Sequence, residues 1–130
     1  MSDFSSSMSA SASGMAAQAA RLRLVSENIA NADTPGFRRK SVSFHTVHEM
    51  FDNAGTVETG RVQLSNAELP QVFDAGHPLA NENGYYQGSN VDLMVEIADA
   101  REAQRSYEAN LKMFDQSRQM ASSILELLKR

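Results

Sequence analysis

The histidines near the middle of the sequence are the residues whose type and spacing first suggest chemistry. His45, His48 and Glu49 place three potential metal ligands within one short segment. The residues around them alternate between apolar and polar, which predicts a strand, and side chains three apart on a strand point to opposite faces. A metal site needs three or four converging ligands, and His77 is the only other histidine. The sequence therefore predicts polar residues at a strand end, with no metal bound.

The basic run Arg38-Arg39-Lys40 is the second candidate. Three adjacent cations can bind an anion or an acidic partner, or they can form the solvated face of a turn. The net charge of −4 argues against a general nucleic-acid binder, which is normally basic. The specific hypothesis is a contact with an acidic neighbouring subunit, and the solvated turn stays open beside it.

Catalysis is not indicated by the remaining residues. The chain has 16 acidic residues, but none is paired with a histidine or serine in a recognisable catalytic arrangement. No glycine-rich phosphate loop is present, and the absence of cysteine removes thiolate catalysis, disulfides and cysteine metal sites. A small hydrolase centred on the histidines would need a pocket that the sequence does not indicate. No enzyme activity and no cofactor are expected.

Length and hydropathy limit the architecture. A chain of 130 residues predicts one domain, with room for a small insertion. No apolar run approaches the roughly 18 residues that a membrane-spanning helix needs. The first residues lack a basic region followed by an apolar core, so we expect no cleaved secretory signal.

Two apolar stripes in 4-3 spacing predict one long helix at each end of the chain, the two packed side by side in coiled-coil fashion. At 1.5 Å per residue each helix would be roughly 45 to 60 Å long. The first stripe runs Phe4, Met8, Ser11, Met15, Gln18, Leu22, Val25, Ile29 and Ala32. The second runs Leu93, Ile97, Ala100, Gln104, Tyr107, Leu111, Phe114, Arg118, Ala121, Leu125 and Leu128.

Polar residues interrupt both stripes at Gln18, Gln104 and Arg118. They can face polar neighbours, or they can set the helix register at a cost in stability. We favour the register role for the two glutamines.

The first helix has little stability of its own. Serines crowd its first half and Gly14 lies inside it, and an interior glycine costs about 1 kcal/mol relative to alanine. Because helix nucleation is costly, we expect this segment to be mobile in the monomer and ordered by packing.

The middle of the chain predicts a small β-rich insertion of two to four strands. The first helix should stop where Pro35-Gly36 forms a type II turn after Thr34. Residues 42–46 alternate like a strand, and Val57 and Val62 flank a plausible hairpin turn at Thr59-Gly60. The fold expected is mainly α, with paired terminal helices at 1–33 and 89–130 and the insertion at 34–88.

Two cap residues are predicted for the second helix. Either Ser89 or Asn90 can cap it, and Ser89-x-x-Asp92 fits a capping box.

Several motifs together resemble the bacterial flagellar rod and hook proteins. The segment from Ser26 to Phe37 closely resembles the signature that closes their N-terminal helix, and Ser13-Gly14-Met15-x-Ala17-Gln18 lies upstream at the family's spacing. Gly76-His77-Pro78, Ala80 and Gly84-Tyr85 resemble the loop before the C-terminal helix in the short proximal-rod members. Arg105-Ser106-Tyr107-Glu108-Ala109-Asn110 resembles a block within that helix.

The resemblance covers nearly the whole chain, with two departures. Phe37 stands where tyrosine is usual, and Gly88-Ser89 precedes Asn90 where these members often have a proline. The positions that carry the resemblance, and that it assigns to assembly, are Gly14, Met15, Gln18, Leu22, Asn28, Ile29, Ala30, Asn31, Thr34, Pro35, Gly36, Phe37, His77, Pro78, Gly84, Tyr85, Asn90, Arg105, Tyr107, Ala109 and Asn110.

What the resemblance implies is a structural subunit of the proximal rod in the flagellar basal body. Such proteins are exported through the flagellar type III apparatus and polymerise through their terminal helices into a hollow shaft. The implied neighbours are copies of the chain, the rod proteins FlgB and FlgF, and the rod-base adaptor FliE, without nucleic acid or a membrane span. The alternative is a helical adaptor of the export system that binds one partner and does not polymerise.

Overall fold

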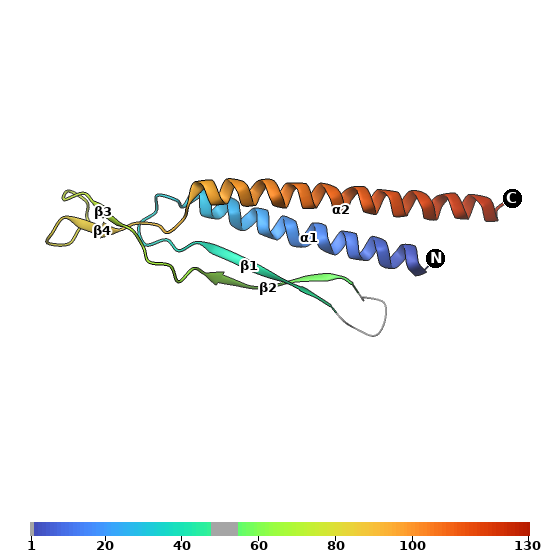
Figure 1. The fold of residues 1–130 in the computed structure, drawn as a ribbon, viewed down its shortest axis with the longest axis horizontal. Coiled ribbons are helices and arrows are strands. Elements are labelled where there is room, and N and C mark those ends of the chain that lie inside the picture. Colours follow the sequence, from blue (N-terminus) through green and yellow to red (C-terminus); the bar gives the residue numbers. More distant parts are fainter. Residues whose placement is uncertain (1, 48–54) are drawn as a thin grey trace.

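The computed structural model describes residues 2–47 and 55–130, which form an elongated molecule (Figure 1). Helix α1 (Ser2–Ala30) and helix α2 (Leu93–Leu128) lie side by side and antiparallel, so the two termini lie at the same end. Figure 1 also shows α2 continuing past the start of α1. The mainly α fold with long paired terminal helices is confirmed.

The β-rich insertion is confirmed as two separate hairpins. Strands β1 (Lys40–Thr46) and β2 (Val57–Leu64) pair antiparallel and run beside α1. Strands β3 (Gln71–Phe73) and β4 (Tyr85–Gln87) form a second antiparallel pair at the end of the molecule away from the termini.

The hairpin expected at Thr59-Gly60 is wrong, because both residues lie inside strand β2. The pairing register shifts by one residue between Val42 and Phe44, so β2 carries one extra residue as a bulge at this point. A Cβ atom on Gly60 would lie 2.7 Å from the Ser43 hydroxyl oxygen. The glycine therefore marks a close approach within the sheet and not a reversal of the chain.

The turn after α1 is the predicted one. The Phe37 amide donates to the Thr34 carbonyl at 3.2 Å, and Gly36 has φ of 74°. Pro35 at the first central position and a glycine with positive φ at the second define a type II turn.

The predicted cap of α2 is wrong by a few residues. The side chain of Asp92 accepts a hydrogen bond from the Met94 amide, so Asp92 is the N-cap. Ser89 and Asn90 are used elsewhere: the Ser89 hydroxyl accepts from the Val91 amide, and the Asn90 carboxamide oxygen accepts from the Arg39 amide. The helix begins later because these two side chains satisfy the loop backbone instead of the helix end.

Few side chains are fully buried, and most of them are small or polar. The buried apolar residues among the described ones are Ala17, Leu24, Val25 and Ala103, and the buried polar residues are Ser11, Asn28, Ser89, Glu96 and Ser117. Neither helix, over the described residues, is long and apolar enough to cross a membrane. A core this small leaves much apolar surface open.

Candidate assembly interface

The two helices meet along residues spaced seven apart on each helix. An antiparallel pair with this spacing keeps one narrow face in contact along its length. On α1 this contact line is Ser7, Gly14, Arg21 and Asn28; on α2 it is Ser117, Asn110, Ala103 and Glu96, in opposite order along the chain.

Contacts at three levels fix the register of the contact line. The Ser7 and Ser117 hydroxyl oxygens are 2.9 Å apart near the termini. Gly14 faces the Asn110 side chain in the middle. At the other end, Arg21 pairs with Asp99 and with Glu102, its guanidinium lying 3.3 Å from the Glu102 carboxylate.

The predicted apolar stripes lie beside this contact line and do not form it. Leu93, Ile97 and Leu111 are exposed, and Met15 and Leu22 are only half-buried. Several large members of the stripes stand one residue after the contact line, and one residue is about 100° of rotation on a helix. These are Met8, Met15, Leu22, Ile29, Ile97 and Leu111. Small and polar residues therefore make most of the contact within the chain. Val25 of the first stripe is buried, whereas the stripe residues one position after the contact line face outward.

Gly14 allows the helices to approach closely at the centre of the pair. A Cβ atom there would lie 2.8 to 2.9 Å from the amide atoms of Asn110. Asn110 is held in this position because its Nδ2 atom donates to the Ser106 carbonyl at 2.9 Å. Both residues belong to the motifs noted in the sequence, and the structure brings them together.

A polar cluster around two buried side chains joins α1, the residue before β1, and α2. Glu96 and Asn28 are 0% exposed, and the Asn28 Nδ2 atom donates to Glu96 at 3.3 Å. Arg39 forms an ion pair with Glu96 and, at 3.2 Å, with Asp99. The members of the cluster are Arg21, Asn28, Arg39, Glu96 and Asp99.

The charge of Arg21 is stabilised within this cluster. Burial of its guanidinium lowers the pKa of Arg21, but the hydrogen bonds and the negative charges of Asp99 and Glu102 outweigh burial and raise that pKa above its usual value. Arg21 therefore remains a fixed cation between two carboxylates.

The basic run after the turn is bonded within the chain. Arg38 donates to the carbonyls of Ser65 and Ala67 at 3.0 and 3.1 Å, Arg39 belongs to the polar cluster, and Lys40 pairs with Glu27. The hypothesis of a contact with an acidic neighbour stays a prediction. Arg38 is the member whose partners are only backbone carbonyls.

The signature segment connects the end of α1 to the start of α2. The Gly36 amide donates to the Gln87 carbonyl at 3.1 Å, and the Asn90 amide donates to the Phe37 carbonyl at 3.2 Å. At the end of the helix the Asn31 side chain donates a hydrogen bond to the Glu27 carbonyl and accepts one from the Thr34 hydroxyl. The turn therefore fixes where α2 begins relative to α1.

The β3–β4 hairpin positions another group of motif residues. His77 stacks on Tyr86 with ring centroids 4.0 Å apart, and Tyr85 contacts Phe73 edge to face. Gly84 has φ of 86°, which suits glycine in the turn before β4. His77 therefore packs against an aromatic ring.

A metal site is not found among the described residues. No group of three or more potential ligands converges in residues 2–47 and 55–130. His45 lies within hydrogen-bond distance of the Ser43 hydroxyl, whereas His48 and Glu49 lie outside the described residues.

The motif residues fall into separate places in the structure. Gly14, Asn28 and Asn110 form part of the contact line, and Gln18 lies beside it; Met15, Leu22, Ile29 and Tyr107 lie on the outward apolar stripes. Asn31, Thr34, Pro35, Gly36, Phe37 and Asn90 form the turn; His77, Pro78, Gly84 and Tyr85 lie at or beside the β3–β4 hairpin; Ala30, Arg105 and Ala109 are exposed.

Sequence reasoning missed Arg21, Glu96, Ala103 and Ser117 as contact residues. The signal that could have found them is the seven-residue repeat of small and polar residues on both terminal segments. This repeat was missed because larger apolar residues stand one position away, and apolar stripes are the pattern that usually indicates a contact between helices.

Comparison with known proteins decides the family. Residues 8–38 match the family model described as "Flagella basal body rod protein", and residues 82–127 match "Flagellar basal body rod FlgEFG protein C-terminal". A "Flagellar basal-body rod protein FlgC" of Agrobacterium fabrum is 38% identical, over 99% of this chain and 98% of the relative. The chain belongs to the FlgC family of flagellar basal-body rod proteins.

Relatives from distant bacteria support the same family. FlgC of Salmonella typhimurium is 34% identical over 88% of this chain and 90% of the relative. FlgC of Bacillus subtilis is 33% identical over 95% of this chain and 97% of the relative. The two family models cover the regions of α1 and α2, and the FlgC relatives span nearly the whole of this chain.

Proposed function

We propose that this FlgC-family chain is a structural subunit of the flagellar basal-body rod. It polymerises through its terminal helices into the wall of a hollow shaft that transmits torque from the membrane ring to the hook. The observation that supports this is the pair of outward apolar stripes on helices that already contact each other by small and polar residues. Apolar surface of this extent on a short chain favours burial against neighbouring subunits.

The neighbours we propose are copies of the chain, the rod proteins FlgB and FlgF, and the adaptor FliE. The chain would reach them through the flagellar type III export apparatus and take its place in the periplasmic part of the basal body. Family membership supports these partners and this location. The relatives are named as rod proteins, so a non-polymerising adaptor is not favoured and no catalytic role is proposed.

The basic run is proposed to contact an acidic surface of a neighbouring subunit through Arg38. The variant Arg38→Glu tests this, because Arg39 is engaged with the buried Glu96 and its replacement would disturb the fold. We expect unchanged monomer solubility and loss of rod assembly with Arg38→Glu. Normal assembly would contradict the contact.

Electron microscopy of basal bodies tests the function directly. A flagellated host that lacks only this gene should form membrane rings without a complete rod, and the gene supplied in trans should restore the rod. A variant with Lys112→Ala, at an exposed position on α2, serves as the matched control and should also restore it. Intact rods and hooks in the deletion strain would reject the role.

A further inference from the structure

Three consecutive residues of α1 point in three directions, and this defines the faces of the helix pair. Ser13 accepts a hydrogen bond from the Val57 amide of β2 at 3.0 Å, so it faces the β1–β2 hairpin. Gly14 faces Asn110 of α2. Successive residues are about 100° apart on a helix, so Met15 lies on the flank opposite the hairpin.

The same reasoning places the apolar stripe of α2. Asn110 faces α1, so Leu111 lies about 100° further round the helix. Because the helices are antiparallel, the residue that follows the contact line falls on the same side of the pair in both helices. Leu93 and Tyr107 stand three residues before the contact line, about 60° round the helix on the same side. This surface, the ridge, consists of Met8, Met15, Leu22, Ile29, Leu93, Ile97, Tyr107 and Leu111.

The ridge is apolar and open in the single chain. Ile97 is 45% exposed and Leu111 is 42% exposed. The ridge residues are apolar from Met8 to Ile29 on α1 and from Leu93 to Leu111 on α2, except that Gln104 stands among them, and Arg118 follows at the equivalent position beyond Leu111. Exposed apolar side chains gathered on one face are a feature that marks interaction sites.

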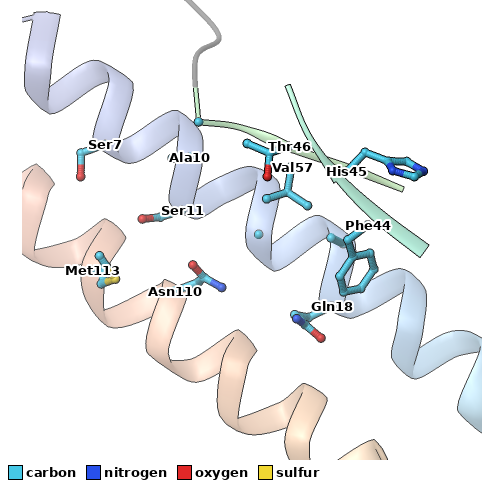
Figure 2. A pocket seen from close by; sticks show the side chains of 13 residues that line it. Ser7, Ala10, Ser11, Gln18, Phe44, His45, Thr46, Val57, Asn110 and Met113 are labelled. Carbon is cyan, nitrogen blue, oxygen red and sulfur yellow. The ribbon is translucent and has the colours of Figure 1, made fainter. Parts of the chain in front are cut away.

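A groove lies on the other side of the helix pair, between α2 and the β1–β2 hairpin. Its volume is about 370 Å³, and Figure 2 shows Asn110 and Met113 of α2 on one side and Phe44, Thr46 and Val57 of the hairpin on the other. Its α1 wall is made of small residues and one glutamine: Ser7, Ala10, Ser11, Gly14, Ala17 and Gln18. None of the lining residues is acidic, and none is lysine or arginine.

We propose that the ridge of one copy of this chain seats in the groove of a second copy. The two surfaces match because both are uncharged, one projects large side chains, and the other is hollow and lined by small residues that allow close approach. A second copy is the occupant because one chain carries both halves of the contact on opposite faces of its helix pair. This inference rests on the proposed assembly into a shaft wall and names the faces that touch.

The contact is heterologous, because the ridge and the groove are different surfaces. A heterologous contact leaves one free ridge and one free groove after every addition, so it builds a ring or an open helix of subunits and does not stop at a dimer. Side-by-side packing of helix pairs in this sense produces a curved wall.

Cysteine crosslinking tests the contact, since the chain has no cysteine and every introduced thiol is unique. Chains with Thr46→Cys, on the groove, are mixed with tagged chains carrying Leu111→Cys, on the ridge, and treated with a flexible bismaleimide. The matched control replaces Leu111→Cys by Lys112→Cys, the next residue on the same helix and also exposed. We expect at least a fivefold higher yield of mixed dimer with Leu111→Cys. Equal yields, or an excess of Leu111→Cys homodimers, would overturn the ridge-in-groove contact.

Mixing two blocked chains gives a second, independent result. Leu111→Asp blocks the ridge and Met113→Arg blocks the groove, both at exposed positions of α2. Circular dichroism serves to check that both variants fold. By sedimentation velocity, each variant alone should be monomeric, while their mixture should form a dimer that grows no further. Growth of either variant alone to the size of wild-type assemblies would contradict the ridge-in-groove contact. Rods restored in cells by the wild-type gene would still support the proposed function, so the two can fail separately.

Discussion

Asn28 of α1 and Glu96 of α2 are both completely buried, and the Asn28 carboxamide joins three elements at once. Its Nδ2 atom donates to Glu96 at 3.3 Å and to the Lys40 carbonyl at 2.8 Å, while its Oδ1 atom accepts from the Lys40 amide at 2.9 Å. An asparagine can satisfy a donor and an acceptor of the same backbone unit, which an apolar residue cannot. This arrangement fixes β1 against the helix pair at the end where the turn begins.

Removal of the buried carboxylate should be strongly destabilising. Glu96→Ala leaves Arg39 with Asp99 as its remaining carboxylate partner, and it leaves one of the two Asn28 Nδ2 hydrogens without an acceptor. Breaking a buried ion pair on one side costs about 3 to 5 kcal/mol. We expect a loss of about 3 kcal/mol in the free energy of unfolding by urea, because Arg39 is partly exposed and can be hydrated.

The matched control for this prediction is Glu102→Ala. Glu102 also pairs with an arginine of the cluster, but its side chain is 68% exposed. An exposed pair contributes about 0.2 to 1 kcal/mol, so the urea midpoint should hardly move. Equal losses for the two variants would show that Glu96 is not a structural anchor.

Gly14→Ala should have opposite effects depending on residue 110. With Asn110 present, the new methyl group would lie under 3 Å from the amide atoms, and overpacking of this kind costs about 1 to 3 kcal/mol. With Asn110→Ala, the space opens and alanine should stabilise the helix by about 1 kcal/mol. A double-mutant cycle by urea denaturation measures the difference, and an additive result would contradict the close contact.

Gly36→Ala should weaken the turn between α1 and β1. Gly36 has φ of 74° and nothing lies within 4 Å of an added Cβ, so the cost is backbone strain and not a clash. The left-handed conformation costs a non-glycine residue about 1 to 2 kcal/mol. Gly76→Ala, at an exposed glycine for which no positive φ is found, is the control. Thermal unfolding should show a lower Tm for Gly36→Ala alone.

Asp92→Ala should lower the stability of the protein, because Asp92 is the N-cap of α2. Loss of an N-cap side chain costs about 1 kcal/mol, and Asp92 accepts the capping bond from the Met94 amide. Asp92→Asn keeps an acceptor in place and should retain most of the stability. If Asp92→Ala unfolds at the same urea concentration as the wild type, the capping role of Asp92 is wrong.

Gln104→Leu tests whether a polar residue among the ridge side chains sets the register. Gln104 is exposed, so its effect should appear between chains and not within the pair. We expect Gln104→Leu to form larger and less uniform assemblies in sedimentation velocity, since one more apolar side chain permits several alignments. Assemblies indistinguishable from the wild type would remove the register role.

The long-range organisation was predictable because it depends on patterns that extend over many residues. The stripe that begins at Phe4 and the one that begins at Leu93 specify two long helices, and Pro35-Gly36 specifies where the first must stop. The alternation of Val42 and Phe44 likewise specifies a strand. Several residues contribute to each of these patterns, so the pattern can be recognised even where single residues depart from it.

The contacts were not predictable because they depend on single residues brought together by the fold. The contact line lies one residue from the apolar stripe, a difference that helix periodicity alone does not resolve. A glycine such as Gly60 is common both in β-bulges and in hairpin turns. Only the pairing of β2 with β1 shows that a bulge is present here. Ser89 is a good N-cap in isolation, but its hydroxyl bonds the Val91 amide and Asp92 caps instead.

The bond between Ser7 and Ser117 joins residues separated by 110 positions in the sequence. Such a contact closes a very long loop, so the association of α1 with α2 cannot start from residues that are close together in the sequence. The start of α1 therefore has no helical partner until the second half of α2 is present, whereas its middle and end can already contact Val57 of β2 and Glu96 at the start of α2.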